Sequence, residues 1–346
     1  MIFVGDIAIP YKDAISIKDL PSALKNKQWF GNLEGALIDN SGNSNQESIV
    51  FNDKIAIKDL CYKYDFKGFA LANNHIFDTG SLKETTDYLT NINVPSIGIG
   101  STLSEANKPF YFTEGDKEVI IINFGWEVIQ CEVNLNGKPT VNPLRKDHVL
   151  KTVGELISLN PKALVLPFMH WSYELEAEPQ PFERDLARQL IDIGAAGVIG
   201  THPHRIGGFE MYNGKPIIYS LGNWMFKQNH YHNGKLRFPD FCNQELAFEW
   251  DFKTGKIKFH FFDYNKKTSV LTYSHSENCS SKTMKNYTPF AGLSKTEYTK
   301  WYKSNHYHKN KGLPIYNWND NKVQIRIKNL INKLRDYSIS LILKIK

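Results

Sequence analysis

The sequence predicts an α/β fold in which strands alternate with helices. Apolar runs of strand length, at 118–124 and 163–168, are followed by a segment with helical apolar spacing at 182–193. Hydrophobic residues make up 41% of the 346 residues and charged residues 23%, which is enough apolar material for a sizeable core. Polar residues that can bind metal ions follow several of the apolar runs. We therefore expect a layered α/β domain with a site at its strand ends.

The individual elements follow from the pattern in chain order. We expect strands at 2–9 and 66–71, a helix at 80–89 capped by Ser81, a strand at 118–124, a helix at 151–158, a strand at 163–168, a helix at 182–193, and strands at 196–199 and 216–221. Leu186, Leu190 and Ile193 share one face of the expected third helix. Two alternating runs at 246–252 and 256–263, joined by a turn at 253–255, predict a β-hairpin that closes the sheet.

The chain divides by composition into a body and a tail. We expect a domain at 1–273, a polar linker at 274–285 and a basic, aromatic tail at 286–346. From Lys282 to the end there are 14 Lys and Arg against 3 acidic residues, a net +11, whereas the remainder carries a net −5. The tail holds Tyr298, Trp301, Tyr302, Tyr307 and Trp318. We expect the body to fold without it.

The end of the tail predicts an amphipathic helix. Its apolar face would carry Ile327, Leu330, Ile331, Leu334, Leu341 and Ile345, with Lys328, Lys333 and Arg335 around it. Such a helix can lie on an anionic membrane surface, or it can pack on the body or on a second subunit, and both interpretations stay open. Nucleic acid is a poor partner, because the body is acidic and the sequence shows no recognition module.

The remaining bulk features indicate a cytoplasmic protein. Cys61, Cys131, Cys242 and Cys279 form no C-x-x-C pair and are expected to be reduced thiols. The first ten residues, MIFVGDIAIP, do not resemble a secretion signal. No apolar stretch reaches the roughly 18 residues that a membrane-spanning helix needs. Peripheral contact with the inner face of the membrane, through the basic tail, is the alternative.

Histidines and acids stand where the expected strands end. His75, His170, His202 and His204 each follow an apolar run, and Asp6 and Glu34 lie in turns flanked by Gly or Asn. Imidazole is the commonest metal ligand in proteins, and carboxylates commonly complete the set. Any one of these positions could equally be a structural histidine or a turn residue. The repetition of the pattern over five turns, in an α/β chain, favours a metal site.

The spacing of His202 and His204 carries a geometric argument of its own. Residues i and i+2 of an extended segment point to the same side, and Pro203 stiffens the segment between them. We therefore expect both imidazoles to face neighbouring metal ions.

These motifs together resemble the bacterial capsule-synthesis family of CapA type, which is named for poly-γ-glutamate capsule. The resemblance rests on GD at 5–6, NLEG at 32–35, ANNHIFDTG at 72–80, HW at 170–171, GTHPH at 200–204 and YSLGN at 219–223. It covers roughly residues 2–265 and leaves the tail unmatched. The family is similar to calcineurin-like metallophosphoesterases, so the resemblance implies a layered α/β/β/α sandwich, here followed by an α-rich basic tail.

The resemblance also implies roles for individual residues. Asp6 and His204 would bind one divalent ion, Asn74, His170 and His202 would bind the other, and Glu34 would bridge them. The ions would be Mn, Fe or Zn. His75 would donate a proton to the leaving oxygen, with its ring held by Asp78. Two such ions can activate a water and clamp both oxygens of an in-line displacement.

Two departures from the phosphoesterase pattern are visible. Asp6-Ile7-Ala8 stands where phosphoesterases carry D-x-H, which removes a histidine from the first ion, and Asn73 replaces a glycine before Asn74. Both departures look typical of the capsule-synthesis family. They leave open whether the chain hydrolyses phosphate esters.

Five further residues are candidates for contacts to substrate or to the ligands: Asn32, Asn73, Glu174, Arg205 and Asn223. Glu174 could orient a ligand or could simply be a solvated acid. Asn223 could face substrate or cap a turn. Arg205 could bind an anionic group or only solvate its loop.

Three functions fit these observations. The first is a metal-dependent hydrolase of phosphate esters, acting on an anionic small molecule or polymer in capsule or surface-polysaccharide synthesis. The second is amide cleavage in a polyglutamate-like polymer at the same ions. The third is a non-catalytic, metal-bearing subunit of a capsule-synthesis complex, docked through the tail.

Overall fold

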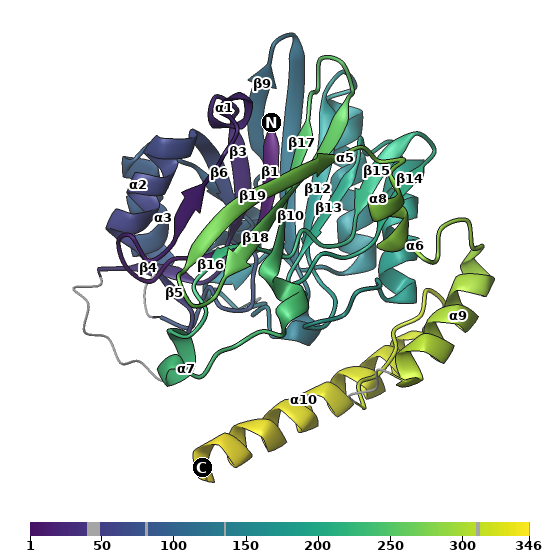
Figure 1. The fold of residues 1–346 in the computed structure, drawn as a ribbon. Helices are drawn as coiled ribbons and strands as arrows, with labels where there is room; N and C mark the ends of the chain where they lie inside the picture. The colour runs from purple at the N-terminus through teal and green to yellow at the C-terminus, as the bar shows by residue number, and fades with distance from the viewer. Residues whose placement is uncertain (40–48, 80–81, 135, 309–311, 346) are drawn as a thin grey trace.

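Two β-sheets lie face to face at the centre of the molecule, with helices on their outer faces (Figure 1). The computed structural model describes residues 1–39, 49–79, 82–134, 136–308 and 312–345. Phe30 of one sheet packs edge-on against Phe168 of the other, with ring centroids 5.5 Å apart. The expected α/β/β/α arrangement is therefore confirmed.

The first sheet mixes parallel and antiparallel strands. It runs in the order β2 (Ser16–Lys18), β19 (Val270–Glu277), β18 (Ile257–Asn265), β17 (Gln244–Trp250), β1 (Ile2–Ala8), β3 (Trp29–Leu33), β6 (Phe66–Ala70) and β7 (Ser96–Ile97), and β16 (Asn223–Phe226) also pairs with β1. Strands β1, β3, β6 and β7 are parallel to one another, so their carboxyl ends share one edge of the sheet. The predicted hairpin is confirmed as β17 and β18, which are antiparallel.

The second sheet has a parallel centre and antiparallel edges. Its order is β14 (Phe209–Tyr212), β15 (Lys215–Ile218), β13 (Val198–Thr201), β12 (Leu164–His170), β10 (Lys117–Gly125) and β9 (Phe110–Glu114). The small pairs are β4 (Ala36–Ile38) with β5 (Phe51–Asp53), and β8 (Ile99–Gly100) with β11 (Thr140–Val141). Each strand expected from the sequence in this half corresponds to β10, β12, β13 or β15.

The helices flank the sheets and link the strands. They are α1 (Ser22–Lys25), α2 (Lys54–Tyr64), α3 (Leu82–Asn91), α4 (Leu103–Ala106), α5 (Lys146–Leu159), α6 (Pro181–Asp192), α7 (Tyr231–Gly234), α8 (Lys282–Asn286), α9 (Lys295–His308) and α10 (Lys322–Ile345), with 3₁₀ turns η1 (Glu127–Ile129) and η2 (Asp240–Asn243). Three of them match the expected helices, at α3, α5 and α6. The expected cap, Ser81, lies outside the described residues.

Both faces of the central strands are buried, which explains their continuous apolar runs. In β10, Val119 and Ile121 point between the sheets, whereas Ile120 and Ile122 pack under the helices. In β1, Phe3 joins the layer between the sheets, and Ile2 and Val4 join the outer layer. Alternate side chains of a strand point to opposite faces, so a strand covered on both sides must be apolar throughout.

The segment expected to be a polar linker, 274–285, is structured. Strand β19 continues to Glu277, and α8 begins at Lys282. The register of β19 against β18 places Ser276 opposite His260 and Glu277 opposite Phe259. Backbone hydrogen bonding between neighbouring strands does not need apolar side chains, so the polar composition concealed a strand.

The first part of the tail also belongs to the body. Phe290, Tyr298 and Tyr302 are each 2% exposed or less. The Tyr298 hydroxyl donates to the Pro179 carbonyl at 2.6 Å, and the Arg184 guanidinium lies 4.4 Å from the Tyr298 ring centroid. Phe290, Tyr298 and Tyr302 therefore complete the core beside α6 and do not belong to a separate unit.

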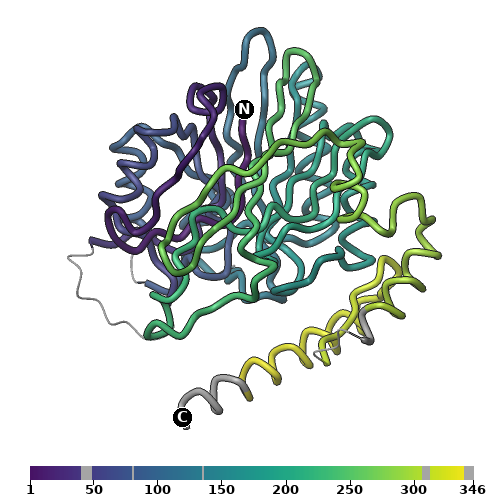
Figure 2. The backbone as a smooth tube through the Cα atoms, in the orientation of Figure 1, coloured from purple at the N-terminus to yellow at the C-terminus, as the bar shows by residue number. Residues whose placement is uncertain are grey.

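Helix α10 leaves this region and runs along the lower edge of the molecule towards the C-terminus (Figure 2). It is amphipathic, as expected, although the side chains of Leu341 and Ile345 lie outside the described ones. Among the helices of the described chain, none combines the length and apolarity needed to cross a membrane.

Candidate metal centre

The six side chains expected to bind metal converge where strands of both sheets end. Asp6 comes from β1, Glu34 follows β3, Asn74 follows β6, His170 ends β12, and His202 and His204 follow β13. Nε2 of His170 lies 2.9 Å from Oδ1 of Asn74 and 3.1 Å from Nδ1 of His202. Nδ1 of His204 lies 3.4 Å from Oδ2 of Asp6. All except Asn74 are buried.

Glu34 occupies the centre of this cluster. Its carboxylate belongs to two groups of donor atoms, one with Asp6 and His170 and one with His202 and His204, and within each group the atoms lie no more than 4.8 Å apart. Its Oε1 atom is buried and accepts no hydrogen bond from the described residues. An unsatisfied carboxylate oxygen surrounded by imidazole and carboxylate donors fits a divalent ion of the Mn, Fe or Zn type.

Burial controls the protonation of these candidate ligands. It raises the pKa of Glu34 well above its ordinary value, with a further rise from the Asp6 charge, and it also raises the pKa of Asp6. Burial lowers the pKa of His170 and His202 well below the usual range, and neighbouring histidines lower it further. Both imidazoles are therefore unprotonated at neutral pH, which is the form that binds metal, and a cation in the cluster would favour the ionised carboxylates.

The backbone at the two final histidines differs from the expectation. His202 and His204 have φ of 96° and 56°, in the left-handed region, and β13 ends before them. The argument from an extended His-Pro-His segment is therefore wrong, although both imidazoles do reach the cluster. Non-glycine residues with positive φ persist only where surrounding contacts hold them, and they concentrate at functional sites.

Close approach of two glycines places Asp6. A side chain at Gly5 would begin 1.8 Å from the Gly222 carbonyl oxygen, so no larger residue fits there. The same carbonyl accepts a hydrogen bond from the Asp6 backbone at 3.0 Å. As a result Asp6 lies in register with Asn223 of the parallel strand β16.

Hydroxyl and amide groups behind the cluster orient the imidazoles. Nδ1 of His170 lies 3.1 Å from the Thr201 hydroxyl, which in turn donates to the Met169 carbonyl at 3.3 Å. The hydroxyl is then the acceptor for His170, so Nε2 of that ring is left with a lone pair facing the cluster. Nδ1 of His204 lies 2.9 Å from Oδ1 of Asn223, which is buried. Asn223 therefore contacts a proposed ligand, His204, through its side chain.

Two further asparagines hold the carboxylates and their loops. The Asn32 amide donates to Asp6 at 2.8 Å and to Glu34 at 2.5 Å. Asn73 donates to the Leu33 carbonyl at 2.8 Å and accepts from the backbone of Gly35 at 3.2 Å. Asn73 thus joins the loops that follow β3 and β6.

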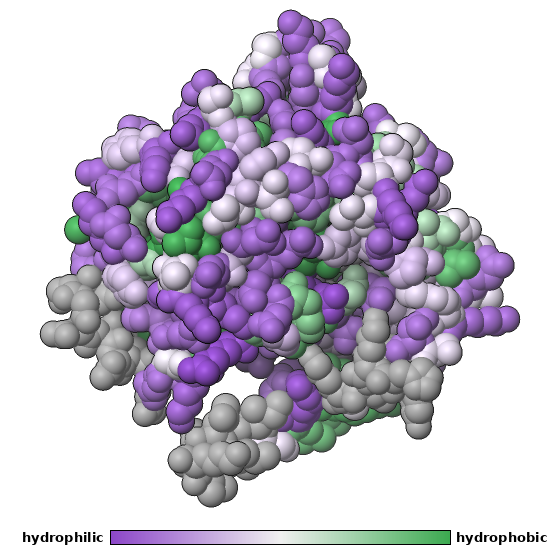
Figure 3. Space-filling view, viewed as in Figure 1, coloured by the Kyte–Doolittle hydropathy of each residue, from purple (hydrophilic) through white to green (hydrophobic). Residues whose placement is uncertain are grey.

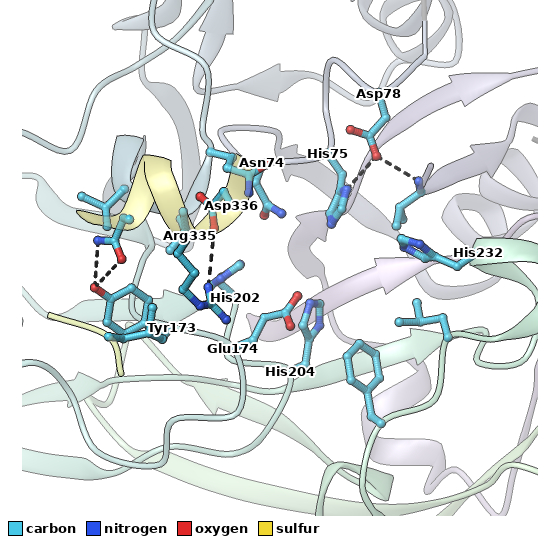
Figure 4. A pocket seen from close by; sticks show the side chains of 18 of the residues that line it. Asn74, His75, Asp78, Tyr173, Glu174, His202, His204, His232, Arg335 and Asp336 are labelled. Carbon is cyan, nitrogen blue, oxygen red and sulfur yellow. Dashed lines mark hydrogen bonds and ion pairs between the residues drawn. The ribbon is translucent and has the colours of Figure 1, made fainter. Parts of the chain in front are cut away.

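His75 lies beside the cluster and forms a pair with Asp78. Nδ1 of His75 is 2.7 Å from Oδ2 of Asp78, and the same oxygen accepts a hydrogen bond from the Val50 backbone at 3.0 Å. Both side chains are about one-fifth exposed and line the cavity (Figure 4). With Nδ1 held by the carboxylate, Nε2 is the ring atom available to exchange a proton with a ligand.

A cavity of about 710 Å³ opens over the cluster. Its walls include Glu174, together with side chains that the sequence analysis did not select as site residues: Tyr173, His232, Asn332, Arg335 and Asp336 (Figure 4). The last three come from α10. These three residues lie far along the chain from the motifs, so the motifs did not indicate them. The basic composition of the tail was the one sequence signal that a positively charged side chain could reach the site.

Arg205 lies elsewhere. Its guanidinium stacks over Phe241, 4.2 Å from the ring centroid, and donates to the Leu175 carbonyl at 3.3 Å. The interpretation of Arg205 as an anion-binding residue is not supported by this placement, since an aromatic ring occupies the face of its side chain. Arg335 lines the cavity instead.

Comparison with known proteins places the chain in a family. The family described as "Bacterial capsule synthesis protein PGA_cap" matches residues 12–228. The chain belongs to this family. The PGA_cap match includes every proposed ligand except Asp6, which precedes it, and it ends before the hairpin of β17 and β18 and the tail.

Two curated relatives carry names from capsule synthesis. The PGA biosynthesis protein CapA of Bacillus subtilis is 30% identical over 189 residues, covering 54% of this chain and 47% of the relative. The capsule biosynthesis protein CapA of Bacillus anthracis is 28% identical over 164 residues, covering 46% and 39%. The chain thus spans less than half the length of these two PGA_cap relatives.

Solved structures show more distant likenesses. A 5'-nucleotidase precursor from Thermus thermophilus has a TM-score of 0.34 and 14% identity, covering 68% of this chain and 45% of that one. The NAD nucleotidase of Haemophilus influenzae has a TM-score of 0.32 and 13% identity, covering 72% and 46%. At these values the likeness carries no information about substrate.

Proposed function

We propose that this PGA_cap protein is a dinuclear metal-dependent hydrolase of phosphate esters that acts in the synthesis of a capsule or surface polymer. The observation that carries the proposal is the position of Glu34, whose buried carboxylate is shared by two groups of donor atoms. One carboxylate between two sets of imidazole and carboxylate ligands is the arrangement that a bridging ligand requires.

The shortest contacts support a particular division of the ligands. Asn74 and His202 each approach His170 to about 3 Å, whereas His204 approaches Asp6. We therefore assign Asn74, His170 and His202 to one ion and Asp6 and His204 to the other. The wider grouping, of donor atoms within 4.8 Å of one another, places Asp6 with His170 and His202 with His204. We base the division on the shorter contacts, because they are the more selective. Bound divalent ions would supply Lewis-acid polarisation and activation of water.

The protein's own groups would complete the reaction. Asn32 fixes the orientation of two carboxylates through one amide, so Asp6 and Glu34 keep their positions as charge changes beside them. His75, oriented by Asp78, would deliver a proton to the leaving oxygen of the ester from Nε2. Arg335 would bind an anionic part of the substrate, because a guanidinium matches phosphate or carboxylate oxygens in a two-pronged geometry.

Amide cleavage in a polyglutamate-like polymer is the alternative chemistry at the same residues. It is favoured by the name of the Bacillus subtilis relative, a PGA biosynthesis protein. The ligand set does not distinguish attack on phosphorus from attack on a carbonyl carbon.

In a third alternative the chain is a non-catalytic, metal-bearing subunit of a capsule-synthesis complex.

One experiment separates the three. The purified chain is analysed for metal content and then assayed, with Mn²⁺ added, against phosphate monoesters, phosphate diesters and γ-glutamyl amides. We expect two ions per chain and turnover of a phosphate ester. Turnover of amides alone would establish the second function. Bound metal with no turnover of any of these substrates would favour the subunit.

A further inference from the structure

Helix α10 packs on the body through its polar side. Asn332 is 3% exposed, and its amide donates to the hydroxyls of Tyr173 at 3.0 Å and Tyr316 at 3.1 Å. One turn earlier, Asn329 accepts a hydrogen bond from the Tyr316 hydroxyl at 2.7 Å. Lys328, on the same side, pairs with Asp320 at 2.5 Å. Polar contacts therefore attach the helix, which is the reverse of the usual arrangement for a surface helix.

The opposite side of α10 is apolar and faces outward. Val323, Ile327, Leu330 and Leu334 are 54–64% exposed, and their spacing of four, three and four residues places them in one stripe. Figure 3 shows hydrophobic residues at the lower edge of the molecule, where α10 runs. The angular position of this stripe is about half a turn from Asn332. A row of exposed large aliphatic side chains on one helix indicates an interaction surface.

Basic residues follow one flank of the stripe. Lys322, Arg326 and Lys333 are exposed and recur at intervals of four and seven residues, so they form a second row parallel to the first. Asp336 is the one acid in the sequence of α10, and it lines the cavity on the other side of the helix. The outward side of α10 therefore combines an apolar stripe with a positive edge.

We propose that the outward side of α10 docks on an anionic lipid surface, with the helix lying in the plane of that surface. Aliphatic side chains would enter the boundary of headgroups and acyl chains, and the basic row would contact negatively charged headgroups. Charge complementarity decides against a second copy of the chain as the occupant. A second copy paired through this stripe would offer the basic row no acidic partner on α10, because Asp336 lines the cavity on the other side of the helix.

The docking places the cavity near the lipid. Asn332, Arg335 and Asp336 of the same helix line the cavity above the metal centre. This consequence rests on the proposed function, because a position near the lipid affects activity only if the cavity binds substrate. The docking itself does not depend on any catalytic activity and is tested without a substrate.

The test is flotation of the whole chain with lipid vesicles. We expect binding to vesicles that contain phosphatidylglycerol, weak binding to phosphatidylcholine alone, and weaker binding as ionic strength rises. The double variant L330S/L334S should bind roughly tenfold less tightly or worse. Its matched control is L159S/M211S, which changes two exposed apolar residues of the body. The control should bind as the wild type does, and all variants should keep their unfolding temperature.

A charge variant tests the basic row separately. K322Q/R326Q/K333Q should lose roughly fivefold in affinity per residue, whereas the exposed body lysines in K58Q/K138Q/K253Q should change affinity little. Absence of wild-type flotation, equal binding to neutral and anionic vesicles, or full binding by L330S/L334S would overturn the proposal. A wild-type dimer that L330S/L334S converts to monomer, without vesicle binding, would assign the stripe to a second copy instead.

Discussion

Nδ1 of His75 lies 2.7 Å from Oδ2 of Asp78, and the pair lines the cavity over the candidate metal ligands. The backbone of Val50 also donates to that carboxylate oxygen, which holds Asp78 in position. His75 is thus oriented from behind by a fixed acceptor, as a general acid must be if its other nitrogen is to face a reacting atom.

We expect His75→Ala to keep its metal ions and to lose turnover. General acid–base catalysis contributes about 10²–10⁴-fold, and the loss should be smaller for esters with good leaving groups, which need less protonation. Metal analysis and kinetics on the same preparation measure both quantities. Asp78→Asn should show a smaller loss, since it disturbs only the orientation of the ring. If His75→Ala loses metal along with activity, His75 is a ligand or a structural support.

Removal of the shared carboxylate should remove metal. In Glu34→Ala the two donor groups lose their common member, so we expect fewer than two ions per chain and no metal-dependent turnover. Glu174→Gln is the control, because Glu174 lines the cavity but belongs to neither donor group. It should keep both ions. A Glu34→Ala protein with two bound ions and full activity would show that the assignment of Glu34 is wrong.

Arg335 should affect binding of substrate more than chemistry. A hydrogen bond to a charged group contributes about 1.5–3 kcal/mol, so Arg335→Ala should raise KM for an anionic substrate roughly tenfold to a hundredfold. Lys333→Ala is matched on the same helix, but Lys333 does not line the cavity. It should leave KM for a soluble substrate unchanged. If the two substitutions raised KM equally, Arg335 would act only through the overall charge of the helix and not by binding substrate.

The position of truncation should decide whether the body folds. Ending the chain after Asn321 removes α10 and its polar contacts, and we expect a folded protein with a modestly lower Tm. Ending it after Lys282 uncovers the pocket filled by Phe290, Tyr298 and Tyr302. Loss of a buried aromatic side chain costs about 3–5 kcal/mol each, so this protein should be unstable or insoluble. Calorimetry of the two truncated proteins tests this. If both were equally stable, the tail from 286 would be a segment that the body does not need for folding.

Glu245 should make stability depend on pH. Burial raises its pKa from the ordinary 4.5 to about 8, while its carboxylate accepts a hydrogen bond from the Met225 backbone at 2.9 Å. Between those two values the unfolded chain is ionised at Glu245 and the folded one is protonated. Stability therefore falls as pH rises through this window and levels off above about 8.

Glu245→Gln removes that ionisation and retains an acceptor for Met225. Its Tm should match the wild-type Tm near pH 4.5 and exceed it near pH 8. The corresponding gain in the free energy of unfolding near pH 8 is on the order of a few kcal/mol. Glu249 offers the opposite case, because His260 and Lys27 lower its pKa to about 2. Glu249→Gln should reduce stability at neutral pH. A Glu245→Gln difference that does not change with pH would contradict the buried, protonated state.

Much of the fold could be predicted because its signals are local. A continuous apolar run such as 118–124 indicates a strand covered on both faces, and the spacing at 182–193 indicates a helix with one apolar face. The whole of strand β19 was missed, and its last residues were expected to belong to a linker. A strand is held in its sheet by backbone hydrogen bonds, which polar side chains neither prevent nor reveal.

The sequence by itself determined which side chains are candidates for the metal centre. Asp6 and Asn74 stand at or near the carboxyl ends of parallel strands of one sheet, and such ends share one edge. His170 ends a strand of the second sheet, so it joins them only because the two sheets pack face to face. Only the tertiary structure decided what surrounds that centre. Arg335 enters the cavity and Arg205 turns away to stack on Phe241 through packing between segments far apart in the chain. Similarly, α10 exposes its apolar stripe because hydrogen bonds with Tyr173 and Tyr316 hold its polar side against the body. Local periodicity specifies that a helix has two unlike faces, but the direction each one takes depends on the partners that the rest of the fold presents to it.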